Sequence, residues 1–212
     1  MNREPAPVIL LFVKAPREGR VKTRLAASVG PLEALRIYRL LVAAVLTRLP
    51  ARCRLEVWFD PPDAEREVRE WLGVRVPAGT TWHAQTKGDL GERLTAAFGE
   101  ALRPGPAEVF AIGGDCPLIP PGAFATAARK LRRGEDAVLG PSADGGYYLI
   151  GMRRPLPALF DRIDWGGDRV CRQTLERAAA QGLRVGLLPE LRDVDTLEDW
   201  HAVRDQLGSS DA

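Results

Sequence analysis

The chain has 212 residues, of which 45% are hydrophobic and 27% are charged, and its formal net charge is +2. This length is enough for one well-packed core and too short for two ordinary domains, so we expect one domain over residues 1–212 with an ordered core from about 8 to 207. No concentrated basic tract is present, which argues against nucleic acid as a partner.

The first third of the sequence predicts alternating strands and helices. Residues 8–13 are a continuous β-rich apolar run, typical of a strand buried on both faces. This run is far shorter than the ~20 residues that cross a bilayer, so we expect no membrane span and a cytoplasmic protein. After a basic loop, apolar residues at helical spacing predict a helix between Pro31 and Pro50. The next expected elements are a strand over 55–59, a helix over 63–72 and a short strand over 74–76.

The remaining sequence continues the alternation. The expected elements are a helix over 91–102, a strand over 109–112, a helix over 121–133, strands over 137–139 and 147–150 around a turn, a helix over 169–181, a strand over 185–188 and a last helix after 196. We expect the tail from 208 onward to be frayed. The order predicts an α/β fold with a mostly parallel sheet and helices on both faces. In such sheets ligands bind beyond the carboxyl ends of the strands, where residues 14–24, 113–117 and 142–146 fall.

The loop over residues 14–24 combines a glycine with dense positive charge. Gly19 lets the backbone turn tightly, and five basic side chains accompany it: Lys14, Arg17, Arg20, Lys22 and Arg24. Exposed amides and cations together make an anion site. Lysine is rare in this chain, yet two of its four lysines lie here, where a compact ammonium suits a phosphate oxygen. The alternative is a solvated basic surface loop.

Several common chemistries are excluded by their motifs. Lys22-Thr23 is like the end of a Walker A loop, but that motif needs glycine directly before the lysine, and here Val21 stands there. A P-loop ATPase or kinase is therefore not expected. The sequence has no Gly-x-Ser-x-Gly elbow, and neither His83 nor His201 has a nearby nucleophile, so a serine-triad hydrolase has no support. The three widely spaced cysteines predict neither a disulfide framework nor a zinc site.

Two acidic segments are candidates for metal binding. Asp115 follows a predicted strand and two glycines, where a carboxylate can hold Mg²⁺ bound to phosphates. The alternative is that Asp115 caps the following turn or helix. Asp193 or Asp195 can act as a second ligand only if their segment returns beside Asp115. Otherwise Asp195 or Thr196 simply caps the last helix.

Two further segments are rich in glycine. Asp144-Gly145 is typical of a hairpin turn, although Gly145 and Gly146 before Tyr147 can also form a pocket wall that a substrate approaches closely. Residues 85–93 contain a lysine, two glycines and a helix start. The ordinary interpretation of that segment is a loop that leads into a helix.

Taken together, five segments resemble a family of the GT-A-like nucleotide-diphospho-sugar transferase superfamily. The chain is most similar to the rSAM/selenodomain-associated transferases, which are related to 2-phospholactate guanylyltransferase. The matching segments run in order over nearly the whole chain: Lys14-Ala-Pro-Arg-Glu-Gly-Arg-Val-Lys-Thr-Arg-Leu25, Gly88-Asp-Leu-Gly-Glu-Arg93, Gly113-Gly-Asp-Cys-Pro117, residues 140–151 and Asp193-Val-Asp-Thr-Leu-Glu-Asp199. Five ordered matches are much more specific than any one of them.

The resemblance implies a single-domain, three-layer α/β/α sandwich with a mixed, mainly parallel sheet and the nucleotide in the N-terminal half. It implies Mg²⁺ or Mn²⁺ on Asp115, with Asp195 as the expected second ligand. It also implies a nucleotide and phosphate site, and it implies that the turn over 142–151 faces the acceptor. The residues concerned are, for the nucleotide, Lys14, Gly19, Lys22, Thr23, Arg24, Gly88 and Gly91, and, for the acceptor, Asp144, Gly145, Gly146 and Tyr147.

The same resemblance implies a metal-dependent transferase with a nucleotide or nucleotide-sugar donor and a small-molecule acceptor. Sugar transferases of this superfamily usually carry Asp-x-Asp at the metal strand, whereas here Gly113 stands in place of the first aspartate. The basic loop also suits a triphosphate better than a diphosphate. We therefore place first a nucleotidyl transfer from an NTP to a phosphorylated or hydroxyl acceptor, with Lys22, Arg24 and Asp115 as catalytic residues. Glycosyl transfer is second and a non-catalytic nucleotide-binding domain third. The sequence predicts no oligomeric state.

Overall fold

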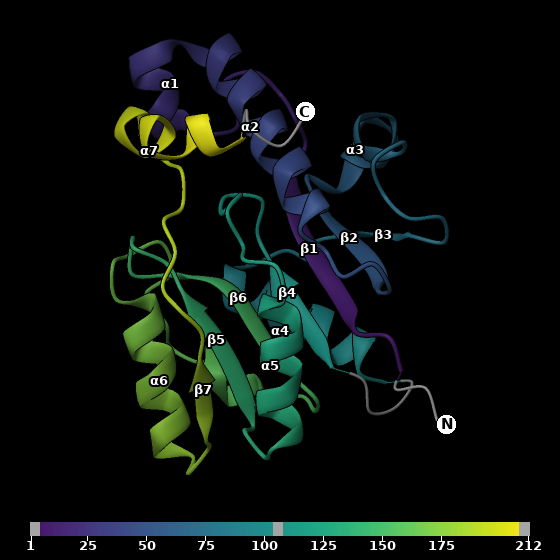
Figure 1. The fold of residues 1–212 in the computed structure, drawn as a ribbon, viewed down its shortest axis with the longest axis vertical. Helices are drawn as coiled ribbons and strands as arrows, with labels where there is room; N and C mark the ends of the chain where they lie inside the picture. The colour runs from purple at the N-terminus through teal and green to yellow at the C-terminus, as the bar shows by residue number, and fades with distance from the viewer. Residues whose placement is uncertain (1–4, 104–107, 208–212) are drawn as a thin grey trace.

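A computed structural model describes residues 5–103 and 108–207 and contains a seven-stranded mixed sheet (Figure 1). The strand order is β3-β2-β1-β4-β6-β5-β7. β6 is antiparallel to both of its neighbours, and the other four pairings are parallel. The strands are β1 (Val8–Lys14), β2 (Arg54–Asp60), β3 (Thr81–Ala84), β4 (Val109–Ile112), β5 (Ala137–Pro141), β6 (Tyr147–Met152) and β7 (Val185–Leu187).

Helices cover both faces of this sheet. α2, α3 and α5 pack on one face around Val42, Val68 and Ala127, and α4 and α6 pack on the other around Phe98 and Ala178. The expected single-domain α/β/α sandwich with a mixed, mainly parallel sheet is therefore confirmed. The helices are α1 (Thr23–Val29), α2 (Pro31–Thr47), α3 (Glu65–Leu72), α4 (Leu90–Ala101), α5 (Ala123–Arg132), α6 (Val170–Ala180) and α7 (Leu197–Leu207).

The central strand β1 shows why its sequence is uniformly apolar. β1 lies between β2 and β4, and both of its faces are covered. Ile9 and Leu11 point into the first core cluster, whereas Val8 and Leu10 point into the second, and all four are at most 2% exposed. Residues that alternate between two buried faces must all be apolar. β1 therefore fixes the position of the basic loop that follows it.

A third cluster connects the two ends of the chain. Leu25 of α1, Ile37 and Leu41 of α2, and Val203 of α7 are buried together. Figure 1 shows α1 and α7 beside each other at one end of the molecule, with the segment after β7 rising to reach α7. This packing returns the C-terminal acidic segment to the neighbourhood of the basic loop.

Two elements differ from the prediction. The strand expected over 74–76 is wrong, because those residues form a turn, Val74 is 92% exposed, and the edge strand β3 begins only at Thr81. Helix α1 was not predicted, since it starts at Thr23 directly after the basic loop and buries little apart from Leu25. The residues of the expected frayed tail lie outside the described part of the chain.

In the described ranges, no helix combines the length and the apolar character that a membrane crossing requires.

Candidate functional site

Segments far apart in the sequence meet beyond the carboxyl ends of the central strands. The amide of Val194 donates to the carbonyl of Asp115, at 3.0 Å, and the amide of Ala143 donates to the carbonyl of Leu191, at 2.9 Å. These bonds hold the acidic segment 191–195 between the end of β4 and the turn after β5. The segment that contains Asp193 and Asp195 therefore returns beside Asp115, as a second metal ligand from this segment requires.

Lys22 lies at the centre of this arrangement. Its Nζ is 2.8 Å from Asp195 Oδ1 and also forms an ion pair with Asp115 Oδ1. The lysine side chain is only 5% exposed, whereas those of Asp115 and Asp195 are 48% and 34% exposed. Burial alone lowers the pKa of Lys22, but the two carboxylates outweigh it, and the net effect is a raised pKa. Lys22 is therefore a buried cation shared by two aspartates.

The backbone at Lys22 has an unusual conformation. Its φ of 47° and ψ of 48° lie in the left-handed region, at the N-cap of α1. A residue with a Cβ pays roughly 1–2 kcal/mol for this conformation. Flanking side chains hold it, because Val21 and Leu25 are 3% and 0% exposed. Such strain is often kept at functional sites, and here it directs the lysine side chain at the two aspartates.

The other basic residues of the loop differ in their ion pairs and in their exposure to solvent. Arg17 Nε donates to Glu67 Oε2 of α3, at 2.8 Å, so Arg17 anchors the loop. Arg24 Nη1 is 3.6 Å from Asp195 Oδ2, but its side chain is 69% exposed. The side chains of Lys14, Arg20 and Thr23 are exposed, and Gly19 has a φ of 69° at the loop tip. The loop thus presents cations and a flexible turn to solvent on the side where a ligand would approach.

The base of the loop is fixed by Tyr38 of α2. The Tyr38 hydroxyl accepts from the amide of Lys14 and donates to the carbonyl of the same residue, both at 3.0 Å. Burial raises the pKa of Tyr38, so its hydroxyl stays protonated and able to donate. Tyr38 was not singled out from the sequence, where it is one more apolar position of a helix.

More acidic groups flank the Lys22 pair. Burial, together with Asp144 and Asp195, raises the pKa of Asp193 to about 6. Asp144 Oδ1 accepts from Ser142 Oγ at 2.5 Å and from the amide of Gly146 at 2.8 Å, which stiffens the turn. Burial and the neighbouring aspartates, first Asp193 and then Asp115, raise the pKa of the Cys116 thiol well above its usual value. Cys116 is therefore a protonated core thiol and not a nucleophile.

Helix α7 is capped without using Asp195. The amide of Thr196 donates to Asp199 Oδ2, at 2.9 Å, and the amide of Asp199 donates back to Thr196 Oγ1, at 3.3 Å. Arg192 Nη1 donates to the other carboxylate oxygen of Asp199, at 3.0 Å. Of the two expected caps, Thr196 is used. The Asp195 carboxylate is left to face Lys22.

The segment over 85–93 is held against the ends of β1 and β2. Gln85 Nε2 donates to the carbonyls of Val13 and Trp58, at 3.2 and 2.9 Å. Arg93 Nη1 donates to Gln85 Oε1, at 3.0 Å, and Arg93 Nε donates to the carbonyl of Gly88, at 3.1 Å. Gly88 is therefore connected, through Arg93 and Gln85, to the end of β1, from which the basic loop leaves the sheet. The sequence showed the segment but not the anchoring role of Gln85, which is a buried polar residue.

The glycine and tyrosine candidates have structural partners. A Cβ on Gly91 would lie 2.9 Å from the Trp165 ring, so only glycine allows α4 to approach that ring. Trp165 contacts Tyr147 edge to face, with ring centroids 6.5 Å apart. Tyr147 therefore packs towards the second core cluster, whereas Tyr148 points into the first, together with Cys116. The structure thus brings Asp144 near Asp193 but turns the Tyr147 ring to the other face of the sheet.

The carboxylates of Asp115 and Asp195 are the candidate ligands of a divalent cation. Among residues 5–103 and 108–207, no three or more His, Cys, Asp or Glu side chains form a metal-binding group. Asp115 and Asp195 nevertheless direct one oxygen each at a single cation, the Lys22 ammonium. Mg²⁺ is often held by one or two carboxylates, with water and substrate phosphates completing its shell. Asp115 and Asp195 therefore fit a phosphate-bound Mg²⁺ or Mn²⁺.

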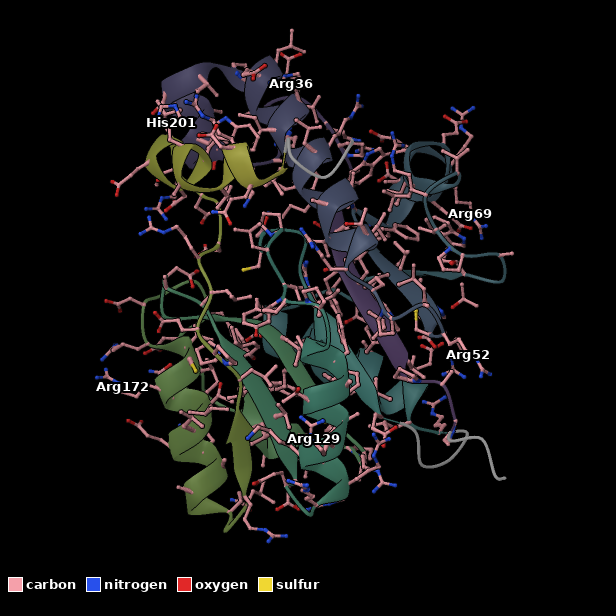
Figure 2. The ribbon with its side chains drawn as sticks, viewed as in Figure 1. Arg36, Arg52, Arg69, Arg129, Arg172 and His201 are labelled. Carbon is pink, nitrogen blue, oxygen red and sulfur yellow. The ribbon has the colours of Figure 1, made fainter. Side chains whose placement is uncertain are left out.

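Positive charge outside the site is dispersed. Figure 2 shows Arg36, Arg69, Arg129 and Arg172 well separated from one another, and they belong to four different helices. Among the described residues, the basic loop is thus distinguished because its cations Lys22 and Arg24 face the Asp115–Asp195 pair, and not by a general excess of positive charge.

Comparisons with known proteins identify relatives of this architecture. The family described as "Uncharacterized protein conserved in bacteria (DUF2064)" matches residues 43–167, a range that contains Asp115 and the turn at 142–146 but not the basic loop. No curated protein sequence matches the chain. The crystal structure of a "putative nucleotide-diphospho-sugar transferase" from Desulfovibrio desulfuricans G20 is 36% identical, with a TM-score of 0.86 over 97% of this chain and 89% of that chain.

More distant structures share the fold. An inositol-1-phosphate CTP transferase from T. maritima is 15% identical, with a TM-score of 0.59 over 96% of this chain and 95% of that chain. Rv0371C of Mycobacterium tuberculosis H37Rv, in complex with manganese, is 18% identical, with a TM-score of 0.54 over 95% of this chain and 100% of that chain. These two likenesses, both below 25% identity, show a shared fold, and of the structures named here only the 36% identical Desulfovibrio protein is similar enough to indicate a family relationship.

Proposed function

The chain belongs to the DUF2064 family, and we propose that it is a nucleotidyltransferase that moves a nucleoside monophosphate from a nucleoside triphosphate to a small acceptor. The observation that carries this proposal is the meeting of Lys22, Asp115 and Asp195 at the carboxyl ends of the strands. A basic loop and paired carboxylates at one point suit a triphosphate and its divalent cation. The cytidylyltransferase fold of the distant neighbours supports the same choice.

Donor binding uses the two walls beside β1. The exposed side chains of Lys14 and Arg24, on the loop that turns at Gly19, bind the phosphates. The segment around Gly88, held in place by Gln85 and Arg93, forms the other wall of the nucleotide site, whereas Gly91 packs against Trp165. Because both walls are anchored to the same strand ends, the donor is positioned by rigid elements.

The chemical step is a substitution at phosphorus. An ionised phosphate oxygen of the acceptor attacks the α-phosphorus, the bond from that phosphorus to the β-phosphate breaks, and pyrophosphate leaves. A hydroxyl acceptor does the same and releases its proton to solvent. Lys22 and Arg24 stabilise the negative charge that develops on the leaving group. When Mg²⁺ or Mn²⁺ is bound, Asp115 and Asp195 hold it, and it supplies further charge neutralisation. The acceptor approaches from the side of the turn at 144–147.

The specific resemblance to rSAM/selenodomain-associated transferases, and through them to 2-phospholactate guanylyltransferase, belongs to this proposal. It favours transfer of a nucleotide onto a small phosphorylated acceptor. The second candidate is glycosyl transfer. The observation that favours it is the 36% identity to the Desulfovibrio protein, whose description refers to a nucleotide-diphospho-sugar.

A two-arm assay separates these activities. In one arm the protein is incubated with each NTP, Mg²⁺ and phosphorylated or hydroxyl acceptors, and pyrophosphate is measured. In the other arm it receives sugar nucleotides, and free nucleoside diphosphate is measured. We expect pyrophosphate with at least one NTP. Diphosphate release with no pyrophosphate would favour glycosyl transfer, and the absence of both products would indicate a non-catalytic domain.

A variant pair assigns the activity to the site. Asp115→Asn should lower kcat/KM for the NTP roughly 100-fold, because a carboxylate that helps to neutralise phosphoryl charge is lost. The matched control is Glu176→Gln on α6, whose side chain is 67% exposed and lies 3.9 Å from Arg172. Equal activity in the two variants would contradict the role of Asp115.

A further inference from the structure

The Lys22 ammonium lies where a metal ion would have to bind. The ammonium contacts Oδ1 of Asp115 and Oδ1 of Asp195. These are the two oxygens that would bind the metal ion. A divalent ion held by this pair would stand beside a full positive charge, which repels it strongly in a partly buried site. The lysine and the ion therefore compete for the same carboxylates.

The competing lysine cannot simply move aside into water. Its side chain is 5% exposed, and its neighbours Val21 and Leu25 are buried. Arg24 differs, since it contacts Asp195 at 3.6 Å with a side chain that is 69% exposed and can swing away. To leave the pair, Lys22 needs another anionic partner nearby. The phosphates of a nucleotide on the 14–24 loop supply that partner.

We propose that Lys22 excludes divalent cations from the Asp115–Asp195 pair until a nucleotide polyphosphate draws its ammonium away, so that metal and nucleotide bind as a unit. This inference rests on the proposed nucleotide site. Coupling of this kind is reciprocal: the metal strengthens nucleotide binding by the same factor as the nucleotide strengthens metal binding.

The test is Mn²⁺ affinity in the absence of nucleotide, measured by electron paramagnetic resonance of free Mn²⁺. Lys22→Met should bind Mn²⁺ at least ~10-fold more tightly than the wild type, because the competing charge is gone while both carboxylates stay. Lys22→Gln is a second neutral variant with the same expectation, and circular dichroism verifies that each variant is folded. The control is Lys130→Met, a lysine of α5 that packs beside Gly186.

The outcomes separate the inference from the proposed function. Unchanged or weaker Mn²⁺ binding in both Lys22 variants would overturn the inference, even if NTP-dependent pyrophosphate release is observed. An equal gain in Lys130→Met would also overturn it, because net charge alone would then explain the effect. Tighter Mn²⁺ binding in both Lys22 variants alone would support exclusion by Lys22. The failure of the wild type to bind any nucleotide would refute the proposed function separately.

Discussion

At the scale of single residues, the site depends on groups that never face a ligand. Tyr38 is 5% exposed, and its hydroxyl satisfies both backbone groups of Lys14, where β1 ends and the basic loop begins. Because buried backbone groups without partners are costly, Tyr38 fixes the direction in which the loop leaves the sheet.

Replacing this hydroxyl gives the first prediction. Tyr38→Phe should lower the free energy of unfolding by about 1–3 kcal/mol, since two backbone groups of Lys14 lose their partner. Urea denaturation measures the loss. Tyr148→Phe is the control, because the Tyr148 hydroxyl donates a single bond of 3.2 Å to the carbonyl of Pro189. A smaller loss in Tyr38→Phe than in Tyr148→Phe would contradict the anchoring role.

At the scale of elements, the N-terminal cap of α7 positions Asp195, the candidate second metal ligand. The reciprocal bonds between Thr196 and Asp199 fix the peptide that follows Asp195. Asp199→Ala should cost about 1 kcal/mol of stability, as the loss of a cap typically does. It should also weaken metal-dependent nucleotide binding, because the Asp195 backbone is no longer held.

Isothermal titration with nucleotide and Mg²⁺ measures that second effect. The control is Glu198→Ala, which removes a carboxylate from the same turn with a side chain that is 88% exposed. If Asp199→Ala binds the nucleotide as tightly as Glu198→Ala, the cap has no influence on the site.

The turn over 142–146 makes a second prediction at this scale. Gly145 has a φ of +87°, and a Cβ there would collide with the carbonyl group of Asp168. Gly145→Ala should therefore destabilise the protein by about 2–4 kcal/mol, from backbone strain and the collision together. Gly166→Ala is a matched control, since Gly166 has a φ of +85° but no atom within 4 Å of its Cβ position. Equal losses of stability in the two variants would show that strain alone is responsible.

The elements also show what local sequence can predict. β1 was predicted correctly because a strand with two buried faces leaves an uninterrupted apolar run. β3 was missed because it is a four-residue edge strand, Thr81–Ala84, whose side chains are not buried in the pattern of a core strand. Helix α1 was missed because its few apolar residues pack on α2 and α7, a contact that local periodicity does not contain.

At the scale of the whole molecule, the site was predictable in part. The rule that ligands bind beyond strand ends selected the loop at 14–24, Asp115 and the turn at 142–146. The contact between Lys22 and Asp195 spans 173 positions in the sequence, and it depends on the backbone bonds of segment 191–195 and on the packing of α7 against α1. The proposed competition between Lys22 and a metal ion follows from that contact, so no local sequence motif predicts it.

The whole fold also gives a direct readout of ligand binding. The two main core clusters lie on opposite faces of one sheet, so a ligand at the strand ends should stabilise both together. A ligand at 100 times its Kd that binds only the folded state adds about 2.7 kcal/mol. For a chain of this size that corresponds to a rise in Tm of about 5–10 °C.

We expect this rise with an NTP and Mg²⁺, and a much smaller rise when EDTA removes the metal, because nucleotide and metal bind together. Sugar nucleotides serve as the comparison set, and Asp115→Asn is the matched protein, since it retains the loop cations but loses one of the two carboxylates that fit the ion. A rise in Tm that is equally large with EDTA, or equally large in Asp115→Asn, would show that nucleotide binding does not depend on the metal or on the carboxylate pair. Lys22 would then interact with the nucleotide alone, and the phosphate loop would bind its ligand without the acidic segment that α7 brings beside it.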